Sequence, residues 1–294
     1  MSLQKDGNRV VIITGLSQGI GQSIAKDFAN SNYNVLLNSP DEKELKTIVA
    51  DISKEIGNNN RISYLVGDIS NTGFADKLME EAIIKWGRLD VLINNGKITN
   101  NPKITSDEEF IPENKLQQEQ QPSSYFVPEE YQTSDPLIRG IYYCIKAAVN
   151  RMLCSNDGDS TIINISSCQG CITQKTVDSF TEYNFGVDPY VDSTARLETL
   201  TKSIALELAD KGIRVNGIVP GLVFNDICQE LVKDVNKRNY KENEVPLGRI
   251  AKPQEISKVA LFLASNEASY ITGAMIPVDG GLMLKRPNYF VEVI

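Results

Sequence analysis

Residues 14–21 read Thr14-Gly15-Leu16-Ser17-Gln18-Gly19-Ile20-Gly21 and carry the strongest structural signal of the chain. They follow the β-branched apolar run of residues 9–13 and lead into apolar residues at helical spacing. A strand, a tight glycine turn and a helix in this order direct free backbone N–H groups and the positive end of a helix dipole to one point. The glycines also permit a phosphate to approach the backbone closely. We therefore predict a nucleotide-binding turn, with a purely structural glycine turn as the alternative.

The alternation of strand and helix continues along the rest of the chain. Short β-branched runs predict strands at 9–13, 33–37, 62–66, 90–94, 161–165, 213–218 and 275–278. Amphipathic patterns predict a helix that begins at Ile20 and further helices at 41–56, 72–86, 136–154, 190–210 and 253–265. Strands that alternate with helices form a parallel sheet with helices on both faces. We expect residues 1–294 to be one α/β domain, with irregular insertions at 98–134 and 172–189 near the substrate mouth.

The composition excludes several classes of function. Apolar residues make up 41% and charged residues 23% of the 294 residues, as in ordinary globular proteins. The 30 basic and 38 acidic residues give a formal charge of −8, so neither nucleic acid nor an anionic membrane is expected as a partner. No apolar run reaches the roughly 18 residues of a membrane span, and we recognise no signal peptide.

Cysteine and histidine usage restricts the chemistry. Five cysteines, an odd number, favour a reducing compartment and hence the cytoplasm. Histidine is absent, which removes the commonest metal ligand and the commonest general base. Cys168 and Cys171 form a C-x-x-C without a second pair, so we expect no metal site and interpret them as small apolar filling.

Further motifs follow the glycine turn in a regular order. They are Gly67-Asp68-Ile69 after the third predicted strand, Asn94-Asn95-Gly96 after the fourth, Asn164-Ile165-Ser166-Ser167 after the fifth, and Tyr190 at the start of a long helix. Together with the C-terminal third, they resemble the short-chain dehydrogenase/reductase family over about residues 8–283. The resemblance implies a Rossmann-type, doubly wound parallel sheet of about seven strands. It also implies an NAD(P)-dependent oxidoreductase that transfers hydride between nicotinamide and a small carbonyl or alcohol.

The resemblance assigns roles to residues at the carboxyl ends of the predicted strands. Ser167 would orient the substrate oxygen, and Tyr190 would exchange a proton with it. The residues carried over as cofactor-binding are Gly15, Ser17, Gln18, Gly19, Ile20, Gly21, Ser39, Asp68, Ile69, Asn95, Gly96, Thr194, Pro220, Gly221 and Val223.

The catalytic positions depart from the family pattern at two places. Thr194 stands four residues after Tyr190, where the family has a lysine that lowers the tyrosine pKa, and Leu137 replaces an asparagine that positions a relay water. An unperturbed tyrosine has a pKa near 10, so action near neutrality needs a shift of about three units, or roughly 4 kcal/mol. Protonated Tyr190 can still donate during reduction. The alternatives are that Tyr190 is an inherited packing residue, and that Lys97 supplies a cation rather than being a solvated loop lysine.

Cofactor choice, assembly and even activity are left open by these departures. The second predicted strand ends in Asn38-Ser39-Pro40 and offers no carboxylate to repel a 2′-phosphate, which favours NADP over NAD. The family resemblance implies a homodimer or homotetramer, and helices 136–154 and 190–210 carry more apolar residues than one core-facing stripe needs. The alternative function is a nucleotide-binding pseudoenzyme that serves as sensor, scaffold or non-catalytic subunit.

Overall fold

A computed structural model describes residues 8–16, 18–57, 59–96, 133, 135–155, 159–168, 189–224 and 242–284. Ser17, Lys97, Cys171 and nearly all of the segments 98–134 and 172–189 lie outside the described residues. Tyr190 is described only through its backbone, which belongs to a helix.

Seven strands and six helices form the described framework, and the strands and helices expected from the sequence are confirmed. The strands are β1 (Val10–Thr14), β2 (Asn34–Ser39), β3 (Ile62–Val66), β4 (Val91–Asn94), β5 (Ser160–Ile165), β6 (Ile213–Pro220) and β7 (Met275–Val278). The helices are α1 (Ile20–Asn30), α2 (Glu42–Ile56), α3 (Phe74–Trp86), α4 (Pro136–Ser155), α5 (Pro189–Leu208) and α8 (Pro253–Leu263). The boundaries differ from the predictions by two residues or fewer.

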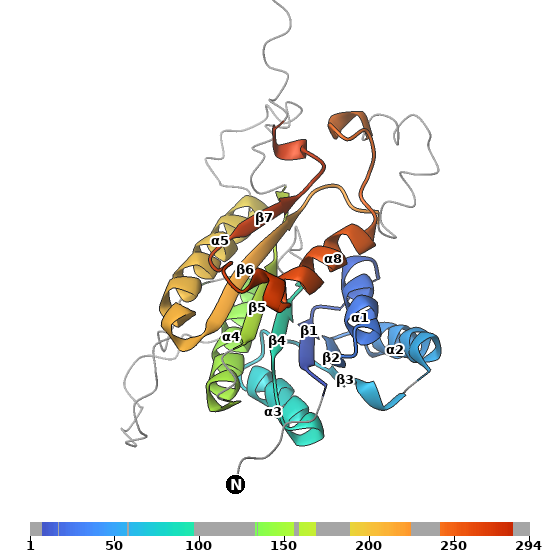
Figure 1. The fold of residues 1–294 in the computed structure, drawn as a ribbon, viewed down its shortest axis with the longest axis vertical. Coiled ribbons are helices and arrows are strands. Elements are labelled where there is room, and N and C mark those ends of the chain that lie inside the picture. The colour runs from blue at the N-terminus through green and yellow to red at the C-terminus, as the bar shows by residue number, and fades with distance from the viewer. Residues whose placement is uncertain are drawn as a thin grey trace, which may run out of the picture.

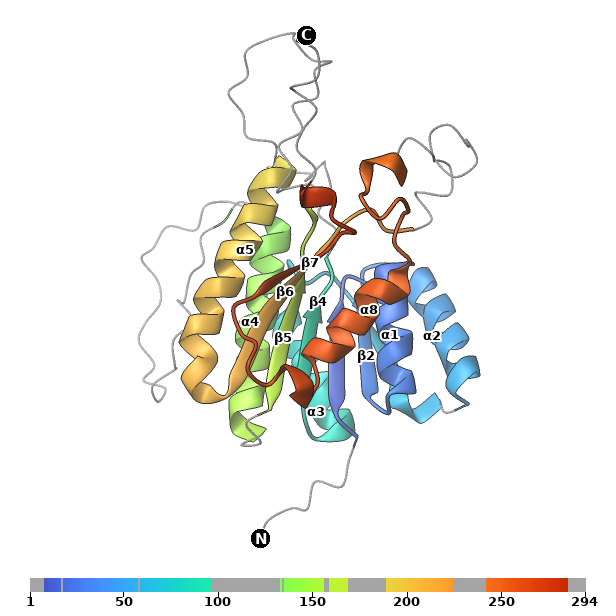
Figure 2. The same cartoon turned by 45° about the horizontal axis from the view of Figure 1, so that its top comes forward.

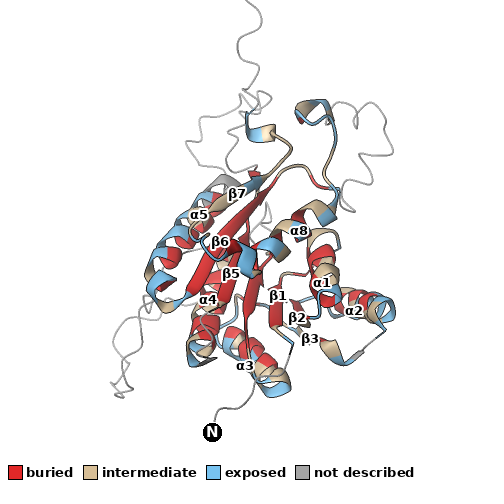
Figure 3. Cartoon of the chain, viewed as in Figure 1, coloured by how far each residue is buried: buried red, intermediate tan, exposed pale blue. Residues whose placement is uncertain are grey.

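The strands form one parallel sheet in the order β3-β2-β1-β4-β5-β6-β7. Helices α1, α2 and α8 cover one face, and α3, α4 and α5 cover the other (Figures 1 and 2). The central strands are buried on both faces (Figure 3), which explains their continuous apolar runs. Among the described helices, none is both long and apolar enough to cross a membrane.

The strand order determines where a ligand can bind. The chain winds outward from β1 to β3 in one direction and from β4 to β7 in the other. The connections leave the sheet in opposite directions on either side of β1 and β4, and doubly wound sheets bind ligands in a crevice beyond the carboxyl ends of such strands. The described residues of the motifs singled out in the sequence lie at this edge of the sheet, because every strand is parallel.

Candidate active site

The glycine turn after β1 packs closely on the end of β4. Gly15 has a φ of +59°, and a Cβ there would lie 2.6 Å from the carbonyl oxygen of Asn95. The Asn95 side chain donates from Nδ2 to the carbonyl oxygen of Gly15 at 3.1 Å. A Cβ on Gly21 would lie only 2.8 Å from the same Nδ2 atom. Gly15 and Gly21 therefore allow the turn to approach Asn95, because a side chain at either position would collide with that residue.

The start of α1 fits an anionic phosphate. Gly19 is the N-cap of α1 with φ 99° and ψ −117°, a combination that only glycine adopts without strain. No side chain caps this helix, and its first turn contains no acidic residue. The first-turn N–H groups and the helix dipole are thus available to the pyrophosphate of a dinucleotide.

A buried chain of polar side chains holds the strand ends beneath this turn. Thr14 donates to Asn94 at 3.4 Å, Asn94 donates to Asn164 at 2.9 Å, and Asn164 donates to Thr201 at 2.9 Å. All four side chains are fully buried. These hydrogen bonds link β1, β4 and β5 to α5. They therefore fix the position of α5, the helix that bears Tyr190, relative to the carboxyl end of β5.

The residues predicted to meet the adenosine half lie at the ends of β2 and β3. Ser39 is buried, and its Oγ accepts from the backbone N–H of Asp41 at 3.2 Å. Asp68 is exposed, and its Oδ1 accepts from the N–H and hydroxyl groups of Ser70 at 2.9 and 2.8 Å. Ile69 is buried close to Gly140 of α4, where an added Cβ would lie 2.7 Å from Ile69 Cγ1. The Ile69 side chain is therefore used in packing against α4.

Glu44 was missed by the sequence analysis. Its Oε1 accepts from the backbone N–H of Gln18, inside the glycine turn, at 2.8 Å. The pattern Asp41-x-x-Glu44 resembles a capping box, which would direct the Glu44 side chain back to its own helix. Only the tertiary structure shows that this carboxylate reaches the turn after β1.

Leu137 fills the space beside Gly96 at the end of β4. A Cβ on Gly96 would lie 2.2 Å from Leu137 Cδ1. Leu137 is held in place because Asp135 Oδ1 accepts from the backbone N–H groups of Leu137 and Ile138 at 2.9 and 3.3 Å. Glycine at position 96 thus leaves the space that the Leu137 side chain fills. Leu137 therefore fills the space next to the end of β4 with apolar atoms.

We expect Gly96→Ala to destabilise the fold by about 1–3 kcal/mol, because the added methyl group overpacks Leu137. In a protein that already carries Leu137→Ala, the added Gly96→Ala change should cost much less stability than it does in the wild type. Urea denaturation of the four proteins measures the coupling between the two sites. Strictly additive losses would show that the two side chains do not share this space.

The start of α5 is joined to the start of α4. Ser193 Oγ donates to Asp135 Oδ2, so the residue that caps α4 also contacts α5. Thr194, the next residue, is 2% exposed.

Ser167 is half-buried beyond the end of β5, and Cys168 beside it is buried. The Oγ of Ser166 is the only buried side-chain oxygen in the described part of the chain without a hydrogen-bond partner.

The loop after β6 closes the site on the far side from the adenosine half. Gly221 allows close approach of Asp279, since a Cβ there would lie 2.6 Å from the Asp279 Cα. Val223 pairs with Ala251 in a parallel bridge, and Pro220 is buried at the end of β6. These contacts fix the segment that the sequence assigns to the cofactor.

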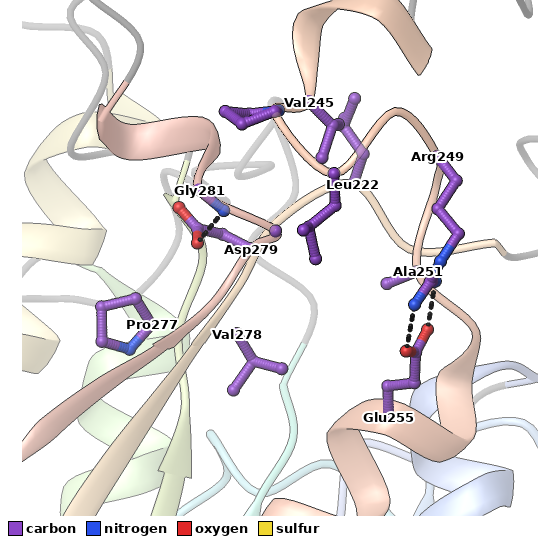
Figure 4. Close-up of a pocket in the computed structure, with 12 residues that line it drawn as sticks. Leu222, Val245, Arg249, Ala251, Glu255, Pro277, Val278, Asp279 and Gly281 are labelled. Atoms are coloured by element: carbon purple, nitrogen blue, oxygen red, sulfur yellow. Dashed lines mark hydrogen bonds and ion pairs between the residues drawn. The ribbon is translucent and has the colours of Figure 1, made fainter.

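A pocket of about 490 Å³ adjoins this loop (Figure 4). Leu222, Val278 and Val245 contribute apolar surface. The charged residues of the lining are Arg249, Glu255 and Asp279. Arg249 forms two hydrogen bonds of 2.7 Å with Glu255, and this pairing lowers the pKa of Glu255 to about 2. The pair is therefore charged and mutually neutralised near neutral pH. Within the described residues, no cluster of three histidine, cysteine, aspartate or glutamate side chains could hold a metal ion.

Comparisons with known proteins agree with this geometry. The family model described as Enoyl-(Acyl carrier protein) reductase matches residues 15–125 and 128–283. L-rhamnose-1-dehydrogenase of Scheffersomyces stipitis is 31% identical over 278 residues, which cover 94% of this chain and 96% of that protein. The 3-oxoacyl-[acyl-carrier-protein] reductase FabG of Chlamydia muridarum is 32% identical over 277 residues, with 94% and 97% coverage.

Solved structures share the fold over nearly the whole chain. A short-chain dehydrogenase/reductase from Brucella melitensis superposes with a TM-score of 0.67 at 26% identity and covers 94% of this chain and 97% of its own. RhlG of Pseudomonas aeruginosa, solved with NADP, gives a TM-score of 0.70 at 24% identity, with 95% and 97% coverage. A parallel seven-stranded sheet with a glycine turn at its switch point is typical of dinucleotide-binding proteins. This chain belongs to the short-chain dehydrogenase/reductase family and is an NAD(P)-dependent oxidoreductase; the pseudoenzyme alternative is not favoured.

Proposed function

We propose that this enzyme reduces the carbonyl group of a small molecule at the carboxyl ends of β4, β5 and β6. The observation that carries the proposal is the shared edge at which Ser167, Gly96 and the glycine turn lie, with α5 tied to β5 through Asn164 and Thr201. The relatives named above are a sugar dehydrogenase and a 3-oxoacyl reductase, so both names describe chemistry at an oxygen-bearing carbon.

Bound NAD(P)H would supply the hydride to the carbonyl carbon. In the proposed mechanism Ser167 holds the substrate oxygen by a hydrogen bond, and Tyr190 gives it a proton. Gly15, Gly19 and Gly21 let the backbone approach the pyrophosphate, and Thr194 offers a hydroxyl group to the nicotinamide ribose. Leu137 fills the space beside Gly96, so we infer that Tyr190 regains its proton after each turnover from solvent on another side of the site.

The absence of a lysine at position 194 favours carbonyl reduction over alcohol oxidation. Thr194 is neutral and cannot supply the charge attraction by which the family's lysine acts on the tyrosine, so we infer that Tyr190 acts in its protonated form. A protonated tyrosine serves carbonyl reduction, whereas alcohol oxidation requires the phenolate. We therefore assign the enzyme to reduction.

A fluorescence titration with NADH and NADPH, followed by a turnover screen over ketones and aldehydes, tests the proposal. We expect saturable binding of at least one nucleotide and turnover of at least one carbonyl substrate. Absence of affinity for both nucleotides up to millimolar concentration would refute it.

We also propose that the enzyme is a cytoplasmic homodimer or homotetramer. The family commonly pairs through helices that correspond to α4 and α5, and Leu206 of α5 is 83% exposed. The apolar residues of these two helices that suggested assembly in the sequence do not support it, because they are buried within this chain. They are Ile141, Tyr142, Ile145, Ala148, Leu197, Leu200, Ile204 and Leu208. A solution mass measured by light scattering tests the assembly.

A further inference from the structure

The carboxylate of Glu44 lies at the edge of the sheet where the adenosine half of a dinucleotide is expected. Glu44 is in the first turn of α2, which begins three residues after β2 ends. Its contact with the Gln18 N–H places it beside the turn after β1. The backbone N–H of Leu16 donates to the carbonyl oxygen of Asn38 at 2.9 Å and joins these two strand ends. Glu44 therefore stands between the ends of β1 and β2.

The capping of α2 leaves this carboxylate available. Asp41 is the N-cap, and its Oδ1 accepts from the Glu44 N–H at 2.9 Å. The N–H of Asp41, which a capping box would offer to Glu44, donates to Ser39 Oγ instead. Glu44 uses Oε1 for Gln18, and an ionised carboxylate has further acceptor positions on both oxygens.

The segment around Glu44 has a small negative net charge. Asp41 and Glu42 lie in the same turn of the chain as Glu44, together with one cation, Lys43. Lys46, the cation on the next turn of α2, forms an ion pair of 2.7 Å with Glu42. A second anionic group introduced beside Gln18 would thus meet the Glu44 carboxylate, in a segment with three acidic and two basic residues at positions 41–46.

In the doubly wound dinucleotide fold, an acidic residue near the end of the second strand hydrogen-bonds the ribose 2′-hydroxyl, whereas an arginine nearby accommodates a 2′-phosphate. This chain has Asn38 and Ser39 at that strand end. The Asn38 side chain is buried, and its Nδ2 donates to the carbonyl oxygens of Leu65 and Gly67 at 3.1 and 2.9 Å, so it is used in joining β2 to the end of β3. The expectation of NADP considered only this strand end, whereas α2 brings the Glu44 carboxylate to the turn after β1.

We propose that Glu44 determines cofactor specificity: it accepts a hydrogen bond from the free 2′-hydroxyl of the adenosine ribose and rejects a 2′-phosphate, so the enzyme prefers NAD(H) to NADP(H). A phosphate monoester carries nearly two negative charges near neutral pH. Like charges about 4–5 Å apart at a protein surface disfavour binding by tenfold or more. The inference rests on the proposed function, since it concerns the same nucleotide site.

The test measures dissociation constants for NADH and NADPH by fluorescence titration of wild type, Glu44→Gln and Glu42→Gln. We expect wild type to bind NADH at least tenfold more tightly than NADPH. Glu44→Gln retains an oxygen that can accept from Gln18 but removes the charge, so it should reduce this ratio by about tenfold, mainly through tighter NADPH binding. Glu42→Gln removes a charge from the same helical turn at a side chain paired with Lys46, and should change the ratio less than twofold.

A competition arm isolates the adenosine subsite from the nicotinamide. In wild type, 5′-AMP should displace bound NADH at lower concentration than 2′,5′-ADP does. In Glu44→Gln, the difference between these two concentrations should shrink by about the same factor as the NADH/NADPH ratio. A wild-type preference for NADPH, or a ratio unchanged by Glu44→Gln, overturns the role of Glu44 while the proposed function stands. Failure of wild type to bind either nucleotide overturns the proposed function and this inference together.

Discussion

The variant Gly19→Asp is expected to lose at least 100-fold in affinity for both NADH and NADPH. An aspartate at the N-cap of α1 would itself accept hydrogen bonds from the first-turn N–H groups, which are uncapped in the wild type. Its negative charge would also repel the pyrophosphate at short range. Fluorescence titration of each nucleotide measures the loss.

The backbone of Gly19 requires a control for strain. Its φ of 99° and ψ of −117° are unfavourable for any side chain, so Gly19→Asp should also lower the melting temperature by several degrees. Gly57→Ala places a side chain at another positive φ, +65°, at the end of α2 with no atom within 4 Å of the new Cβ. This control should lose some stability but bind both nucleotides normally. Nucleotide affinity within threefold of wild type in Gly19→Asp would refute the phosphate-binding role of the turn.

The variant Thr194→Lys is expected to raise kcat/KM for alcohol oxidation at pH 7 by about 100-fold and to raise carbonyl reduction far less. A lysine one helical turn after Tyr190 would place a positive charge on the same side of α5. At about 4 Å and an effective dielectric constant near 20, that charge is worth up to roughly 4 kcal/mol, or about three pKa units. Because the charge favours the phenolate, the pH profile of oxidation should move toward lower pH.

Thr194→Met is the matched control, since it adds length at the same buried position without charge. It should leave the pH profile of oxidation unchanged. If Thr194→Lys has no effect, the apolar filling beside β4 is limiting, and Gly96→Ala/Leu137→Asn/Thr194→Lys should then show the gain. A loss of activity in Thr194→Lys would mean that another group performs the proton transfer, contrary to the assigned role of Tyr190.

Local patterns in the amino-acid sequence were sufficient to predict the framework. The apolar runs of β1, β4 and β5 indicate buried parallel strands, because each strand is covered by helices on both faces. The glycines of residues 14–21 indicate a turn that requires positive φ and close backbone contact, and Gly15 and Gly19 adopt positive φ in the structure. Strand order and the position of the crevice follow from the alternation of strands and helices and from the family resemblance.

The tertiary structure alone decided which side chains meet at the ends of the strands. Glu44 contacts Gln18 across 26 residues of sequence, and no local pattern indicates this contact. Leu137 fits against Gly96 because that residue lacks a methyl group, and Ile69 is used in packing against α4. Hydrophobic period and turn chemistry depend on neighbours in sequence and can be recognised there. Contacts between side chains from separate strand ends depend on how helices pack against the sheet, which no local pattern encodes.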